Sequence, residues 1–472
     1  MGAMNTARFM LIGGLLLSGA ARSFAVPGAT AATGNTTLSA EQKRAKIAEY
    51  LSAAMAATDR IDYVGYRQAT FSGIAETRLL AGDKDGAREA LKKAEQCEVN
   101  PGERIWTDIY FARAQVISGD AGAALKTIDS LDNPKSRDNG HRELAATLAM
   151  LGDIAGAKAM VDKISDEKAK QQAWQRIAKA QARGGDLAGA RVSMASLSDT
   201  AAKWRVSRVI AEAEAKAGKA AAALATADTI TDARLKQKTL FEIAEAETKI
   251  GHKDDALHAY ELVIAVADKL NALDKKISAY CEIAVGMARN GDKAAAKAIF
   301  DKARQMQKDV KPVASPTGAP SIVHSRLPDA MVRAGDIAGA IEEANGDAAE
   351  CAWSITMQQV EAGDFAGAHK TAASTKDNID TILIIAYAEA KAGDLAGVRK
   401  SVDSLDTNEA QVRQHYTLFR NIGTAHSAAG ELNALEAWAE FHRDAPAIQA
   451  NLLLGAARGL MPPVPKEEID YD

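Results

Sequence analysis

The stretch GGDLAGARVSMASLSD, residues 184–199, is one copy of a phrase that recurs along the chain. Close variants are LGDIAGAKAMVDKISD at residues 151–166 and AGDLAGVRKSVDSLDT at residues 392–407. Each copy begins around a Gly–Asp pair and continues with small and apolar residues. A phrase repeated at nearly fixed intervals is typical of proteins built from stacked supersecondary units.

The glycine of each pair measures the period of the repeat. Four successive spacings between these glycines are 33 residues, and the others range from 28 to 44. A period in the low thirties is the length of one helix–turn–helix unit. The eleven positions are Gly82, Gly119, Gly152, Gly185, Gly218, Gly251, Gly291, Gly335, Gly363, Gly393 and Gly430.

The sizes of the residues around the glycines recur from repeat to repeat and support two helices per unit. Eight residues before the glycine, all eleven units have a large apolar residue, such as Ile177 or Ile283. Alanine follows it in eight units, and alanine also recurs five residues after the glycine, as at Ala190. A bulky side chain beside a small one lets two helices pack closely. These columns are therefore predicted to be buried between helices.

The Gly–Asp pair itself is typical of a turn between two helices. Glycine ends a helix well because it adopts the left-handed conformation at little cost. Aspartate follows the glycine in eight of the eleven units, as at Asp186, and its carboxylate caps the free amides of a following helix. A phosphate-binding loop is not indicated, because such loops carry several glycines between a strand and a helix.

With these columns the chain resembles the tetratricopeptide-repeat family, in a degenerate form of an exported bacterial type. Family positions are matched by Trp174-x2-Ile177-Ala178 and, in another unit, by Tyr280-x2-Ile283-Ala284 with Ala296-x3-Phe300. The resemblance covers roughly residues 68–445, and the closing proline of the family pattern is mostly missing. It implies a binding scaffold without catalytic residues, so we expect a protein that is not an enzyme.

We therefore predict an all-α fold, a right-handed α-solenoid of about eleven helix–turn–helix repeats with a period of about 33 residues. The expected segments are a signal peptide at 1–25, a disordered leader at 26–38, an N-terminal capping helix at 39–67, repeats 1–7 at 68–308, an insertion loop at 309–322, repeats 8–11 at 323–445, and a C-terminal capping helix with an acidic tail at 446–472.

The first 25 residues predict export. Arg8 precedes the apolar run FMLIGGLLLSGA, and the small residues of SFA, residues 23–25, suit a signal peptidase. The run is shorter than a transmembrane helix, and no later segment reaches spanning length. We therefore expect a periplasmic or secreted protein without a transmembrane segment in its mature chain.

Charge and composition disfavour several functions. Without residues 1–25 the chain has 56 basic and 62 acidic residues, since Arg8 and Arg22 are lost from the 58 basic ones. A net charge of −6 argues against nucleic acid as a partner. The eight histidines and three cysteines show no spacing typical of a metal site, and no nucleophile motif is present. We expect no metal, no cofactor and no catalytic residues.

The concave face lined by the first helices is the expected binding surface. Positions ten and six before each glycine, one helical turn apart, are predicted to point into this groove. The candidate partner-binding residues are Arg113, Arg142, Lys179, Arg205, Arg208, Trp353, Met357, Leu383 and Tyr387. The basic members suit carboxylate groups and the apolar members suit a buried anchor. Alternatively, the basic residues only pair along neighbouring helices and the apolar ones belong to the core.

A second basic column lies two residues before the glycine. Cations in the last turn of a helix offset its dipole, so we assign this column to stability. Its members are Arg183, Lys216, Lys249, Arg289, Arg333 and Lys391.

Three functions remain open from the sequence. The first is an exported scaffold that binds a protein or peptide in its groove. The second is an architectural, oligomer-forming envelope protein, and the third is a glycan- or small-molecule-binding protein or enzyme subunit. The sequence names neither the partner nor the oligomeric state.

Overall fold

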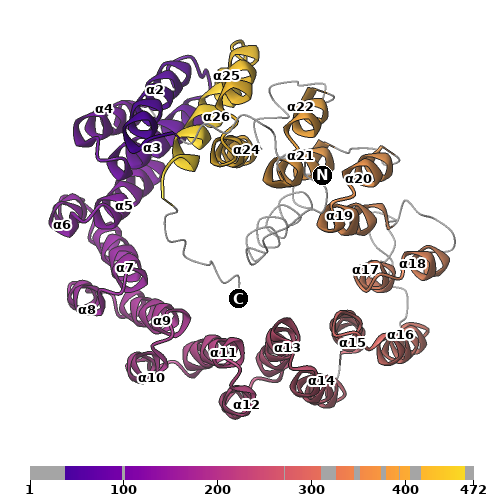
Figure 1. The fold of residues 1–472 in the computed structure, drawn as a ribbon. Helices are drawn as coiled ribbons and strands as arrows, with labels where there is room; N and C mark the ends of the chain where they lie inside the picture. Colours follow the sequence, from indigo (N-terminus) through magenta and orange to yellow (C-terminus); the bar gives the residue numbers. More distant parts are fainter. Residues whose placement is uncertain are drawn as a thin grey trace. The chain divides into compact units, whose positions relative to one another are not determined.

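The computed structural model describes residues 38–97, 101–270, 272–309, 326–344, 351–373, 379–392, 394–403 and 416–462. Every regular element in these ranges is a helix, so the predicted all-α fold is confirmed (Figure 1). The expected signal peptide, most of the leader, most of the insertion loop and the acidic end of the tail lie outside the described residues.

Twenty-two of the described helices follow one another in the chain as eleven successive pairs. Their bounds are α3 (Val64–Leu80) and α4 (Lys84–Glu95); α5 (Pro101–Ile117) and α6 (Ala121–Asp129); α7 (Pro134–Met150) and α8 (Ile154–Asp162); α9 (Glu167–Arg183) and α10 (Leu187–Ala195); α11 (Thr200–Lys216) and α12 (Ala220–Asp228); α13 (Ala233–Ile250) and α14 (Lys253–Ala267); α15 (Leu273–Arg289) and α16 (Lys293–Gln307); α17 (Arg326–Arg333) and α18 (Ile337–Glu343); α19 (Ala352–Ala362) and α20 (Phe365–Ala372); α21 (Ile379–Ala392) and α22 (Leu395–Asp403); α24 (Tyr416–Ala428) and α25 (Leu432–Phe441). Two further helices flank the pairs, α2 (Ala40–Thr58) and α26 (Pro446–Gly459).

The repeated glycine lies in the turn between the two helices of a pair. Ten of the eleven glycines are described, and all ten have a positive φ between 70° and 96°. Gly393 is outside the described residues. The left-handed turn predicted from the Gly–Asp phrase is thus confirmed, and it is the reason why glycine recurs there.

The aspartate after the glycine caps the second helix. In all eight units that have this aspartate, its carboxylate accepts a hydrogen bond from the backbone N–H three residues later. The donor–acceptor distances are 2.8–3.0 Å. One residue type therefore begins the second helix in eight of the eleven hairpins.

The predicted apolar columns form the core. All eleven large residues eight positions before the glycine are buried, from Ile74 to Ile422. The alanines beside them and those five residues after the glycine are buried as well, as Ala178 and Ala190 illustrate. Bulky and small side chains thus alternate in the interface between the helices, as their sizes predict.

The chain divides into two compact units. Unit 1 contains Met1–Met160 and Ala386–Asp472, and unit 2 contains Val161–Ile385. In unit 2 the first helices α9, α11, α13 and α15 each contact the next. These helices form one row, and the second helices α10, α12, α14 and α16 form another (Figure 1).

Unit 1 brings the two flanking helices together. Helix α26 contacts α2, α3 and α24. On α25, the Glu436 carboxylate accepts hydrogen bonds from Lys46 Nζ at 2.9 Å and from the Tyr50 hydroxyl at 2.7 Å, both on α2. Arg458 of α26 donates to Glu76 and Thr77 of α3 at 3.1 and 2.9 Å. The two helices expected to cap separate ends of the array therefore contact each other.

Candidate functional site

The row of first helices in unit 2 forms a face on which charged side chains of neighbouring repeats pair with one another. Arg208 of α11 is an example of how neighbouring repeats are joined there. Its Nη1 donates to both carboxylate oxygens of Glu242 on α13, at 2.8 and 2.9 Å. Burial raises the pKa of Glu242 to about 7, and the negative charge of Glu212 adds to this effect, although Arg208 opposes it.

Further ion pairs connect successive first helices along this face. Arg289 of α15 lies 3.6 Å from Glu245 of α13, and Arg333 of α17 contacts both oxygens of Glu282 on α15 at 2.6 and 3.0 Å. Both arginines belong to the basic column two residues before the glycine. Two members of this column, which the sequence assigned to the helix dipole, therefore also join a repeat to the preceding one.

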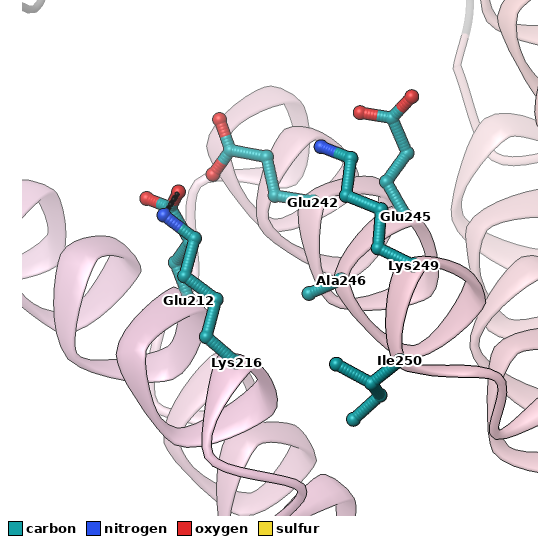
Figure 2. A pocket seen from close by; sticks show the side chains of 7 residues that line it. All are labelled: Glu212, Lys216, Glu242, Glu245, Ala246, Lys249 and Ile250. Atoms are coloured by element: carbon teal, nitrogen blue, oxygen red, sulfur yellow. Dashed lines mark ion pairs between the residues drawn. The ribbon is translucent and has the colours of Figure 1, made fainter. Parts of the chain in front are cut away.

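A pocket lies between α11 and α13 on this face, and Figure 2 shows it from close by. Glu242, Glu245 and Lys249 project to the same side of α13. The pocket combines three carboxylates and two ammonium groups with apolar side chains. Its lining residues are Glu212, Lys216, Glu242, Glu245, Ala246, Lys249 and Ile250.

Lys249 is the distinctive cation of this pocket. It makes no ion pair or hydrogen bond with any residue in the described part of the chain, whereas Arg289 and Arg333, at the equivalent positions, are both paired. The carboxylate that Lys249 would reach by analogy is Glu212, but Glu212 pairs at 2.7 Å with Lys216 of its own helix. In the preceding repeat the position equivalent to Glu212 holds a cation, Lys179. Lys249 thus does not repeat the pairing that Arg289 makes with the preceding first helix.

The five basic residues predicted from the sequence lie in different units. Arg113 and Arg142 belong to unit 1, and Lys179, Arg205 and Arg208 belong to unit 2. Lys179 and Arg208 are buried, and Arg205 is half-buried. Arg208 borders the pocket through its ion pair with the lining residue Glu242.

In unit 1, Arg113 contacts the next first helix and Arg142 pairs with its neighbour in the sequence. Arg113 Nε donates to Thr147 Oγ1 at 3.3 Å, and its guanidinium lies 5.9 Å from the centre of the Tyr110 ring. Arg142 pairs at 3.2 Å with the adjacent Glu143.

The four predicted apolar residues are also divided. Trp353 is 40% exposed on α19, and Met357 is half-buried one turn later. Leu383 is only 1% exposed on α21. Tyr387, which belongs to unit 1, is half-buried, and burial raises the pKa of its hydroxyl. Trp353 and Met357 therefore share a helix, while Leu383 is part of the core.

Of the ten described residues that stand ten positions before the glycine, four are buried and six are half-buried or exposed. Ile109, Arg208, Cys281 and Leu383 all hold this position and are all buried. The next residue along the chain is rotated by about 100° around the helix. At that position Glu242 lines the pocket and Tyr110 is 47% exposed. At the same position Val209 and Ile384 are 1% and 5% exposed, so neither column lies uniformly on the open side of the first helices.

Sequence reasoning missed a hydrogen bond that ties the two helices of a hairpin together. A side chain four residues before the glycine accepts a hydrogen bond from a hydroxyl twelve residues later, at 2.6–2.9 Å. We call it the hairpin clamp. Its five pairs are Gln115–Thr127, Gln181–Ser193, Glu214–Thr226, Gln359–Thr371 and Glu389–Ser401. The signal was present in the sequence, since both positions stand at fixed distances from the glycine.

None of the described helices combines the length and the apolar character needed to cross a membrane. The three cysteines, Cys97, Cys281 and Cys351, are buried and form no disulfide among themselves.

Comparisons with known proteins add little to this geometry. No family model matches the chain, and no curated protein does. Among solved structures, Ton1535 from Thermococcus onnurineus NA1 is 16% identical, over 67% of this chain and 99% of that one, with a TM-score of 0.25.

Two further solved structures match over most of this chain. A Rap protein complexed with competence and sporulation factor is 14% identical, over 87% of this chain and 99% of its own, with a TM-score of 0.28. A circular tandem repeat protein is 12% identical, over 89% and 96%, with a TM-score of 0.17. Because all three TM-scores are below 0.5, these likenesses carry no argument about the function of this chain.

Proposed function

We propose that this protein is a helical-repeat scaffold that binds a protein or peptide on the row of first helices in unit 2, without catalysis of its own. The observation that carries the proposal is the pocket between α11 and α13. It offers an ammonium group, Lys249, that has no carboxylate partner among the described residues, beside the apolar surface of Ala246 and Ile250.

The chemistry of the pocket favours a segment with a carboxylate side chain. Such a side chain pairs with Lys249 and lays its methylene groups on Ile250. Glu245 and Glu242 stand close by and suit a basic group or backbone amides of the same segment. Repeat proteins bind extended segments because each repeat adds one more contact along a continuous face.

We also propose that the protein acts outside the cytoplasm. The support for this is the Arg8-flanked apolar run in residues 1–25 and the small residues that follow it.

The test is affinity capture of the full chain, tagged at its C-terminus and produced in its source cells. Wild type, Lys249→Gln and Lys297→Gln are compared, because Lys297 is an exposed lysine on the second helix α16 and its change removes the same charge. We expect one set of proteins that wild type and Lys297→Gln enrich and that Lys249→Gln loses. The mass of the recovered chain reports whether residues 1–25 have been removed.

Two outcomes contradict the proposal. Equal enrichment by all three baits places the binding surface elsewhere. Recovery of the chain alone favours the architectural, self-assembling function. A glycan- or small-molecule-binding protein is favoured if a soluble saccharide, rather than a protein, raises the melting temperature of wild type.

A further inference from the structure

The hairpin of α13 and α14 departs from the repeat pattern at three positions around one turn. The residue four before the glycine is Glu247, but the residue twelve later is Ala259, which has no hydroxyl to complete the hairpin clamp. The residue after Gly251 is His252, where eight other units have the capping aspartate. The third is Asp255, at a place that Gly or Ala holds in those eight units.

The first departure leaves a buried carboxylate incompletely satisfied. Glu247 is 0% exposed, and its Oε1 has no hydrogen-bond partner in the part of the chain that the structure describes. Glu214, at the same position one repeat earlier, has both oxygens bonded, one by Thr226 and the other by Arg191. A buried carboxylate oxygen without a donor is costly unless a cation faces it.

The other two departures place ligand groups beside that carboxylate. His252 Nδ1 lies 3.0 Å from Glu247 Oε2 and 4.0 Å from Asp255 Oδ2. The three ligand atoms all lie within 4.8 Å of one another. The imidazole lies close to the preceding repeat. A Cβ added to Gly218 would be 3.3 Å from its Cε1 atom.

We propose that Glu247, His252 and Asp255 form a binding site for a divalent transition-metal ion, with Zn²⁺ as the best match. Imidazole nitrogen with two carboxylate oxygens suits Zn²⁺, whereas Mg²⁺ and Ca²⁺ prefer oxygen ligands alone. Ligand bonds of about 2.1 Å in a tetrahedron set the ligand atoms about 3.4 Å apart, which lies between the two distances from His252 Nδ1.

The spacing of these three residues in the sequence is not typical of a metal site. His252 and His258 are six residues apart and do not share a helix face, so histidine spacing alone gives no signal. The metal site is indicated instead by the three positions at which this hairpin differs from the other repeats. The side chains of His252 and Asp255 are 48% and 56% exposed, which leaves a fourth position of the ion open to water.

The test is calorimetric titration of the metal-free full chain with Zn²⁺ at neutral pH. We expect one ion per chain at this site, and a rise in melting temperature on binding. Two variants replace a ligand with the residue that the chain itself uses at the equivalent position, where the aspartate carboxylate is occupied by the helix cap. Glu247→Gln copies Gln181, and His252→Asp copies Asp186, so both are expected to fold.

Each of these variants should weaken Zn²⁺ binding at least about tenfold. The matched control is His258→Gln, an exposed histidine on the same helix α14, which should change the affinity by less than about twofold. Ala259→Ser restores the clamp hydroxyl without touching a ligand, and its competition for Glu247 should also weaken binding.

The proposal is overturned if the wild type takes up no Zn²⁺, or if Glu247→Gln and His252→Asp bind it as tightly as wild type. Equal losses in His258→Gln and His252→Asp would also overturn it, because they indicate adsorption to surface histidines. Helical circular dichroism of each variant verifies that a lost affinity does not reflect lost folding.

Discussion

The two units of this protein are stabilised in different ways. In unit 2 each hairpin contacts its neighbours in the sequence, and the same columns are repeated from hairpin to hairpin. In unit 1 helices from the two ends of the chain pack together, and residues about 380 positions apart form hydrogen bonds. Stability in a stack of repeats is a sum of neighbour terms, whereas a contact between distant ends makes separate segments depend on one another. Unit 1 should therefore unfold more cooperatively than unit 2.

The substitution with the largest expected effect disrupts the contact between α24 and α26 in unit 1. A Cβ on Gly455 would lie against the backbone carbonyl of Arg420, which is not a flexible side-chain end that moves aside. We expect Gly455→Ala to destabilise unit 1 by about 3 kcal/mol or more. Calorimetry and hydrogen exchange measure this loss of stability. The rate of amide hydrogen exchange should rise in α2 as well as in α26.

An unchanged exchange rate in α2 after this substitution would contradict the dependence of the two ends on each other. Unit 2 serves as the internal reference, because protection in α11 and α13 should not change.

An intermediate effect concerns the acid stability of unit 1. His426 of α24 is 2% exposed, its ring nitrogens have no hydrogen-bond partner among the described residues, and burial lowers its pKa to about 4. Its ring stands 5.7 Å from that of Trp438. Since an unfolded histidine titrates near 6.5, the unfolded chain binds the proton first as the pH falls. Stability of unit 1 should therefore fall from about pH 6.5 to about pH 4, by on the order of 3 kcal/mol.

Urea unfolding of the wild type and of His426→Gln between pH 7 and pH 4 measures this difference. Glutamine does not titrate, and it is the residue at this position in other hairpins, as at Gln115. The same pH dependence in both proteins would show that other groups cause it.

The substitution with the smallest expected effect changes the glycine of one turn in unit 2. Gly185 has a φ of +85°, and a Cβ there would meet nothing within 4 Å. Gly185→Ala therefore carries only the cost of a left-handed alanine, about 1 kcal/mol. Hydrogen exchange should increase in α9 and α10 alone. An effect as large as that of Gly455→Ala, or one that spreads to distant repeats, would remove the distinction between the units.

Much of the fold follows from single residues and their spacing. The glycine turn, the aspartate cap and the buried apolar column each depend on side chains within a few positions of one another, and all three were predictable. The candidate site was less predictable. Arg208 was correctly placed on a first helix, but its pairing with Glu242, 34 residues away, depends on how two hairpins rotate against each other.

The sequence by itself determined the all-α repeat, the turn in each hairpin and the residues between its helices, because these follow from local backbone preference and side-chain size. The tertiary structure decided which charges are paired, that Lys249 has no carboxylate partner among the described residues, and that Glu247 faces His252. It also decided that α2 packs on α26. Those contacts join residues on different helices, and their distances are fixed only when the helices pack.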